Sequence, residues 1–143
     1  MGTYPFTKRR FARALAVEVI YRFYLLGEPV EVSLKDVLAR EELDEDERAL
    51  LETIVNTHRA MRERIVALLE KSSHNWRPDR LLFLDRAIIE AAAAELMAGK
   101  TPHKVVISEA VEIAKSLSTE KSPGFVNGVL DGILREMAAE GTQ

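Results

Sequence analysis

The stretch that decides the fold class is residues 101–137, TPHKVVISEAVEIAKSLSTEKSPGFVNGVLDGILREM. Its apolar residues recur every three or four positions, the spacing of one buried face of an α-helix. One stripe consists of Ile107, Ala110, Val111, Ala114 and Leu117, and the next consists of Val126, Val129, Leu130, Ile133 and Met137. Thr101-Pro102 and Ser122-Pro123 each look like a helix cap followed by proline in the first turn. These residues therefore predict two consecutive helices.

Helical periodicity also dominates the rest of the chain, and no segment alternates apolar and polar residues as a half-buried strand does. We predict a first helix over residues 7–26, ended by Gly27 and Pro29, and a second helix from Ser33 onward. A third helix is predicted over residues 44–70, with a break near His58, and a fourth over residues 80–98. Asp44 and Glu47 have the spacing of a capping box at the start of the third helix.

The predicted fold is therefore all-α, a compact bundle of six or seven helices arranged as two small sub-bundles in one domain. Residues 71–78 are the predicted connector between an N-terminal half of about residues 1–76 and a C-terminal half of about residues 77–143. The alanine run at residues 91–94 allows a neighbouring helix to come close. Gly124, Gly128 and Gly132 recur every four residues and predict similarly tight packing.

Composition excludes several classes of protein. The chain has 143 residues, 47% of them hydrophobic, and no cysteine, which excludes disulfides, thiolate metal sites and a cysteine nucleophile. Its apolar runs fall short of the roughly 20 residues of a membrane span, and Glu18 and Arg22 interrupt the apolar stretch behind the basic start. We therefore expect a cytoplasmic protein with no membrane segment.

No catalytic constellation is evident in the sequence. Glycine-rich phosphate loops are absent, and the three histidines are isolated rather than spaced as metal ligands. Glu109 and Glu112 lie one helical turn apart, a spacing that we interpret as a solvated carboxylate pair. We predict no enzyme activity, no cofactor and no metal.

Charge is distributed unevenly, although the net charge is only −3. Residues 1–26 contain five basic residues and one acidic residue, a net of +4, whereas residues 27–56 contain three basic and ten acidic residues, a net of −7. Such an asymmetry can mark a nucleic-acid surface. The alternative for the acidic run at residues 41–47 is a solvated loop and helix start.

The first predicted helix carries the basic residues together with two tyrosines. At 100° per residue, its expected core side consists of Ala12, Leu15, Ala16, Val19, Phe23 and Leu26. The expected outward side consists of Arg10, Arg13, Val17, Tyr21 and Tyr24, with Lys8 and Arg9 near its beginning. Guanidinium groups match phosphate oxygens and tyrosine rings stack on unpaired bases, so this side predicts binding of single-stranded RNA. In the alternative, the arginines pair with the acidic segment and the tyrosines pack against a second helix.

Several blocks of the chain, in order, resemble the NusB family of bacterial transcription antitermination factors. The most specific block is residues 122–131, SPGFVNGVLD, and a second is residues 102–115, PHKVVISEAVEIAK. Further matches are Leu84-Asp85-Arg86-Ala87-Ile88, Glu95-Leu96, and the run from Arg9 through Arg13 to Tyr21. The resemblance covers nearly the whole chain.

The resemblance implies an all-helical fold of two small bundles that binds the boxA element of nascent RNA together with NusE, a small-subunit ribosomal protein. It also implies a place in the antitermination complex of RNA polymerase, notably on ribosomal RNA operons. Related domains are fused to RNA cytosine methyltransferases. Those enzymes need a Rossmann-type domain and a cysteine nucleophile, and this chain has neither the length nor the cysteine.

The resemblance carries RNA-binding roles onto particular residues. Arg9, Arg10 and Arg13, with Lys8 beside them, match the family's arginine-rich segment, and Tyr21 matches its downstream tyrosine. The resemblance also places four further residues near RNA, namely Asp85, Lys115, Lys121 and Phe125. Asp85 has the alternatives of a helix cap or an ion pair with Arg86, and Phe125 has the alternative of a core position.

The leading prediction is an RNA-binding adaptor whose first helix holds the RNA backbone and whose C-terminal bundle receives NusE. One alternative is a helical protein-interaction module without RNA affinity, or a homodimer that covers the basic face. A helix-turn-helix DNA-binding protein is disfavoured because the basic residues lie at the N-terminus rather than on the second helix of a short pair.

Overall fold

The computed structural model describes residues 6–73 and 82–141, and these form six α-helices without a strand. The helices are α1 (Lys8–Leu26), α2 (Val30–Arg40), α3 (Glu45–Ser73), α4 (Phe83–Ala98), α5 (His103–Leu117) and α6 (Ser122–Gly141). The all-α prediction is confirmed.

Polar caps and glycines set the helix ends where the sequence predicts them. The Thr7 hydroxyl accepts the backbone N–H of Arg10 at 3.3 Å, and Gly27 closes α1 with a left-handed φ of 70°. At the start of α3, Asp44 accepts from the Glu47 backbone at 2.8 Å and Glu47 accepts from the Asp44 backbone at 3.0 Å. This reciprocal pair is the predicted capping box.

Several predicted positions are wrong by a few residues. The helix predicted from residue 80 begins at Phe83. The second helix starts at Val30 rather than Ser33, because Pro29 takes the cap position; Ser33 is buried inside α2 and donates to Glu28. The break in α3 falls at Met61, with φ −113° and ψ 15°, rather than near His58. The cap of α5 is Pro102 rather than Thr101. Most of the predicted connector lies outside the described residues, and its first three residues belong to α3.

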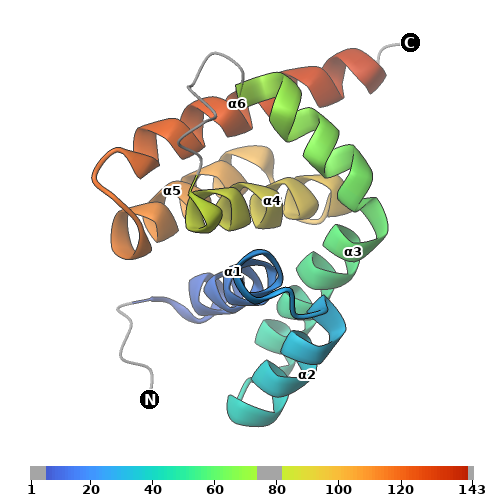
Figure 1. The fold of residues 1–143 in the computed structure, drawn as a ribbon, viewed down its shortest axis with the longest axis vertical. Helices are drawn as coiled ribbons and strands as arrows, with labels where there is room; N and C mark the ends of the chain where they lie inside the picture. The colour runs from blue at the N-terminus through green and yellow to red at the C-terminus, as the bar shows by residue number, and fades with distance from the viewer. Residues whose placement is uncertain (1–5, 74–81, 142–143) are drawn as a thin grey trace.

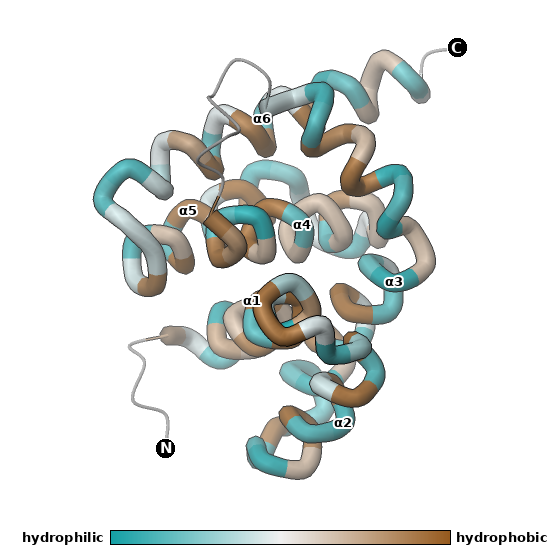
Figure 2. The backbone as a smooth tube through the Cα atoms, viewed as in Figure 1, coloured by the Kyte–Doolittle hydropathy of each residue, from teal (hydrophilic) through white to brown (hydrophobic). Residues whose placement is uncertain are grey.

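Helix α1 lies in the middle of the fold. It packs against α2 and α3 on one side and against α4 and α5 on the other, and α6 covers α4 and α5 from the far side (Figure 1). The second part of α3 also packs against α4 and α6, so α1 and α3 join the two groups of helices. Hydrophobic residues are concentrated along the interior helices, whereas hydrophilic residues dominate the outer turns (Figure 2).

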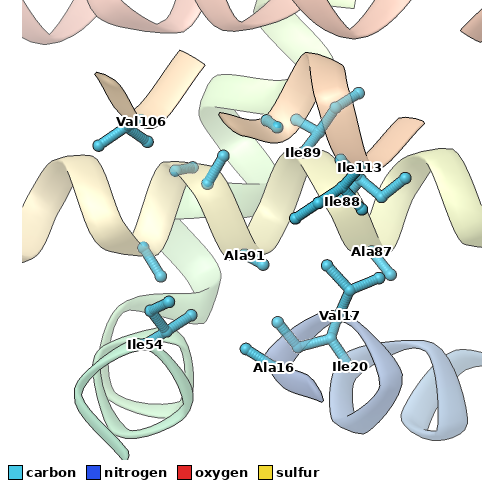
Figure 3. Close-up of a cluster of buried hydrophobic side chains, with 14 of the residues drawn as sticks. Ala16, Val17, Ile20, Ile54, Ala87, Ile88, Ile89, Ala91, Val106 and Ile113 are labelled. Atoms are coloured by element: carbon cyan, nitrogen blue, oxygen red, sulfur yellow. The ribbon is translucent and has the colours of Figure 1, made fainter. Parts of the chain in front are cut away.

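Small and branched aliphatic side chains fill the space between α1 and α4. Figure 3 shows side chains of α1 facing those of α4, with contributions from α3 and α5; the labelled set is Ala16, Val17, Ile20, Ile54, Ala87, Ile88, Ile89, Ala91, Val106 and Ile113. The four alanines at residues 91–94 are all buried, which permits the predicted close approach. Burying each large aliphatic side chain contributes about 1.5–3 kcal/mol.

Within the described residues, no helix combines the length and apolar character that a membrane crossing requires. The same part of the chain holds no group of three or more histidine and carboxylate side chains arranged to bind a metal ion.

Candidate nucleic-acid interface

The side of α1 predicted to face solvent is largely covered. Val17 is 2% exposed and Arg13 is 6% exposed, because α4 and α5 pack over that side. Tyr24 is half-buried, and Leu26, predicted to face the core, is 65% exposed. The predicted solvent face of α1 is therefore wrong, although its first turn remains at the surface.

The first two basic residues of α1 contact the acidic segment. The Lys8 ammonium lies 3.1 Å from the Asp44 carboxylate, and the Arg9 guanidinium lies 2.9 Å from that of Asp46. For Arg9, the alternative in which the arginines of the first helix pair with the acidic segment is confirmed. Both pairs are solvent-exposed, so each is weak and can exchange partners readily.

The next two arginines pair with the C-terminal half instead. Arg10 donates two hydrogen bonds of 2.9 Å to Glu109 on α5, and Arg13 donates two of 2.8 Å to Glu95 on α4. Arg13 also lies 3.6 Å from Glu109. Glu109 is therefore a partner of arginine rather than half of a solvated pair with Glu112. The hydrogen bond from Arg10 lowers the pKa of the Glu109 carboxyl, an effect that burial partly opposes.

Two adjoining grooves flank the start of α1, with volumes of about 380 and 160 Å³. We call them together the Arg9–Lys100 groove because Arg9, Lys100 and Thr101 line both parts. Thr7, Arg13, Pro102, Val105 and Glu109 complete the first part, and Asp46, Ala49, Leu50, Thr53, Glu95 and Ala98 complete the second.

A separate groove of about 290 Å³ runs beside the middle of α1. We call it the Tyr21 groove; it is lined by Phe11, Ala14, Leu15, Val17, Glu18, Tyr21, Leu84 and Leu117. Tyr21 is half-buried in this wall. Its mostly apolar lining and aromatic ring suit the face of an unpaired base.

Asp85 lies next to the Tyr21 groove but is itself buried. Its carboxylate accepts a hydrogen bond from the Ser118 hydroxyl, at the end of α5. Arg86 does not form the ion pair with Asp85 that was one structural alternative, since it pairs with Glu90 at 2.7 Å. Asp85 thus joins the start of α4 to the end of α5.

The remaining candidates gather around the turn between α5 and α6. The Ser122 hydroxyl donates to that of Ser118 at 2.9 Å, which brings the start of α6 close to Asp85. Lys121 is exposed in this turn, and Phe125 is half-buried against the core. Lys115 pairs with Glu112 at 3.1 Å. The structure therefore places the predicted residues in two groups, one at the start of α1 and one around the Tyr21 groove and the α5–α6 turn.

A buried polar network centred on Glu90 was not predicted from the sequence. This carboxylate accepts from the Tyr24 hydroxyl at 2.7 Å and from Arg86 at 2.7 Å, and lies 2.7 Å from His58 Nε2. Burial acts to raise the pKa of Glu90, but the hydrogen bonds from His58, Tyr24 and Arg86 outweigh it and lower the pKa. Lys100 and Thr101, which line the Arg9–Lys100 groove, were also not predicted as site residues, because neither lies in the blocks that resemble the NusB family.

The fold and these surfaces define a small all-helical protein with cation-lined and aromatic grooves suited to a polyanion that carries stacking bases. The NusB family model matches residues 10–135, and the chain accordingly belongs to the NusB family of transcription antitermination proteins. This membership confirms the resemblance noted in the sequence and the prediction that the chain is not an enzyme.

Individual relatives match over nearly their full length. The chain is 35% identical over 133 residues to the transcription antitermination protein NusB of Natranaerobius thermophilus, covering 90% of this chain and 96% of the relative. It is 36% identical over 134 residues to that of Koribacter versatilis, covering 92% of each.

Solved structures show the same fold. NusB from Aquifex aeolicus, solved in solution, matches with a TM-score of 0.78 at 29% identity, covering 94% of this chain and 93% of that one. A crystal structure of the antitermination factors NusB and NusE in complex with dsRNA matches with a TM-score of 0.79 at 30% identity, covering 90% of this chain and 97% of that one.

Proposed function

We propose that this protein binds boxA RNA together with NusE and thereby supports antitermination by RNA polymerase, notably on ribosomal RNA operons. The observation that carries the proposal is the placement of four basic residues and a tyrosine-lined groove along α1. Lys8, Arg9, Arg10 and Arg13 stand at its first turns, and Tyr21 stands three turns on. The similar structure solved with NusE and RNA supports the choice of partners.

The geometry gives the basic residues of α1 different roles. Lys8 and Arg9 are exposed, and Arg10 is about a quarter exposed, so all three can exchange a carboxylate for a phosphate. Arg13 is buried between Glu95 and Glu109 and acts by positioning Glu109, which in turn holds Arg10. In this proposal Lys8, Arg9 and Arg10 bind phosphate, and Arg10 is the ligand whose orientation Glu109 fixes.

Bases of the strand would occupy the Tyr21 groove, with Tyr21 as the stacking ring. Asp85, held by Ser118, would accept from a base amino group, and Phe125 would offer a second ring. Lys115 and Lys121 would contact phosphates at the far end. The protein would bind nascent RNA in the cytoplasm.

The experiment that tests this function is titration of the protein with boxA RNA and with a scrambled RNA of equal length, each with and without NusE. We expect boxA to bind more tightly than the scrambled control, and NusE to increase the difference. Equal affinity for the two RNAs in both conditions would overturn the specific function.

The second candidate is a protein-interaction module or homodimer without specific RNA binding. The pairing of every basic residue in the first turns of α1 with a carboxylate favours it, because this surface is already neutralised. Sedimentation across a concentration series separates the candidates. A dimer that RNA does not dissociate, combined with no preference for boxA, is the result expected from this alternative.

A further inference from the structure

Lys100 stands in the short turn between α4 and α5 and faces the Arg9–Lys100 groove. Gly99 ends α4 in a left-handed conformation, with φ 71°, and the chain turns sharply toward Pro102. This turn brings Lys100 beside Arg9, although the two are far apart in sequence. Both side chains are solvent-exposed.

The groove is lined by three cations, Arg9, Arg13 and Lys100, and by three carboxylates, and Lys100 is the cation that has no ion-pair partner among the described residues. Its three carboxylates are each engaged by an arginine of α1: Asp46 by Arg9, Glu95 by Arg13, and Glu109 by Arg10. Among the described residues, no carboxylate lies within ion-pairing distance of Lys100 or of nearby Lys104. An anionic ligand would therefore find Lys100 free and would not have to displace an internal partner.

The lining of the groove suits a sugar–phosphate backbone. Thr101 adds a hydroxyl donor beside the ammonium group, while Pro102 and the exposed Val105 offer apolar surface. Phosphate oxygens accept hydrogen bonds from ammonium and hydroxyl groups, and this recognition does not depend on base identity. Among the described residues, no aromatic ring lines either part of the groove, so this lining offers no stacking platform of the kind that the Tyr21 groove has.

We infer that the Arg9–Lys100 groove is a second phosphate subsite for the RNA strand, in which Lys100 binds a phosphodiester beyond the segment held by Arg10. The inference rests on the proposed function, and it extends the RNA path away from the Tyr21 groove and across the α4–α5 turn. The subsite contributes affinity without sequence preference.

The test compares Lys100→Ala with Lys35→Ala by fluorescence anisotropy. Lys35 is an exposed lysine on α2, outside both grooves, and its replacement removes the same single charge. On boxA RNA with several flanking nucleotides at each end, Lys100→Ala should weaken binding about fivefold at low salt and reduce the slope of log affinity against log salt by about 0.7. Lys35→Ala should remain within about twofold of the wild type, and Lys100→Arg should restore binding.

Truncated RNAs locate the contact. Removing the flank at one end of the RNA should abolish the difference between Lys100→Ala and the wild type, whereas removing the other flank should preserve it. If Lys100→Ala binds the fully flanked RNA as tightly as the wild type does, the subsite is wrong. It is equally wrong if the variant weakens NusE binding in the absence of RNA, since the groove would then serve a protein partner.

The two proposals fail in different ways. If the wild type does not distinguish boxA from the scrambled RNA, the proposed function fails. If the wild type distinguishes them and Arg10→Ala weakens binding while Lys100→Ala does not, only the subsite fails. Melting temperatures of both lysine variants should match the wild type, because both side chains are exposed.

Discussion

Arg13 and Glu95 form a bidentate ion pair that joins the second turn of α1 to the last turn of α4. Two parallel hydrogen bonds of 2.8 Å join the guanidinium to the carboxylate, and the two side chains are 8% and 4% exposed. The partners are 82 residues apart in sequence. A pair so deeply buried leaves an uncompensated charge in the interior when either partner is removed.

Arg13→Ala should therefore lower the free energy of unfolding by about 3–5 kcal/mol. Urea denaturation measures the loss. Replacing both residues by apolar ones, Arg13→Met with Glu95→Leu, should cost less than Arg13→Ala alone, because no charge remains buried. A loss below about 1 kcal/mol in Arg13→Ala would show that water solvates the carboxylate in the folded protein.

Arg10→Ala should weaken boxA binding and reduce the salt slope by about 0.7, because one phosphate contact is lost. Arg64→Ala is the matched control, since Arg64 is an exposed arginine that pairs with Glu140 at the opposite side of the fold. Titration at several salt concentrations provides both quantities. Unchanged affinity in Arg10→Ala would contradict the assignment of Arg10 as a phosphate ligand.

Tyr21→Ala should cost about 1–3 kcal/mol of RNA-binding free energy if the ring stacks on a base. Tyr21→Phe keeps the ring and should retain most of the affinity. Calorimetric titration with boxA RNA measures the difference. The contrary outcome is a lowered melting temperature with unchanged RNA affinity, which would assign Tyr21 to packing alone.

Glu109 should make stability dependent on acid pH. Its pKa lies below the ordinary value of 4.5, because Arg10 hydrogen-bonds the ionised form. The native carboxylate thus adds stability above its ordinary pKa, and that stability disappears as pH falls through the lowered native pKa. Between about pH 5 and 3, the unfolding free energy of the wild type should fall more steeply than that of Glu109→Gln. Parallel urea curves at each pH test this; identical slopes would contradict it.

Gly132→Ala should be less stable than Gly124→Ala by about 1 kcal/mol or more. A Cβ at residue 132 would lie 3.1 Å from the Ser72 Cβ on α3, whereas a Cβ at residue 124 would meet nothing within 4 Å. Both substitutions gain the helix preference of alanine, so their difference isolates the contact between α3 and α6. Thermal unfolding of the two variants provides the comparison, and equal melting temperatures would mean that α3 shifts freely.

Local signals in the sequence were sufficient to predict most of the helix ends. Thr7, the Asp44–Glu47 box and the glycines at 27 and 99 act within one helical turn, so their effect is visible without tertiary context. The start of α2 was misplaced because Ser33 resembles a cap, while Pro29 provides no side-chain hydrogen bond to signal one. The break at Met61 has no glycine or proline at that residue to predict it.

The orientation of α1 could not be predicted from its own periodicity. An arginine on an amphipathic helix normally faces water, and Arg13 faces the interior only because Glu95 and Glu109 arrive from the other half of the chain. Val17, one turn further on, is buried by the same two helices. Lys8, Arg9, Arg10 and Arg13 all lie in the first two turns of α1, but tertiary packing decides which carboxylate each of them meets.

The central position of α1 has a consequence for synthesis on the ribosome. Of the six described helices, α1 is translated first, and it packs against α3, α4 and α5, which are translated later. Until α4 appears, the side of α1 that carries Arg13 and Val17 has no neighbour to cover it. Folding therefore waits for the latter part of the chain, and the nascent N-terminal segment presents an apolar, basic helix to its surroundings in the meantime.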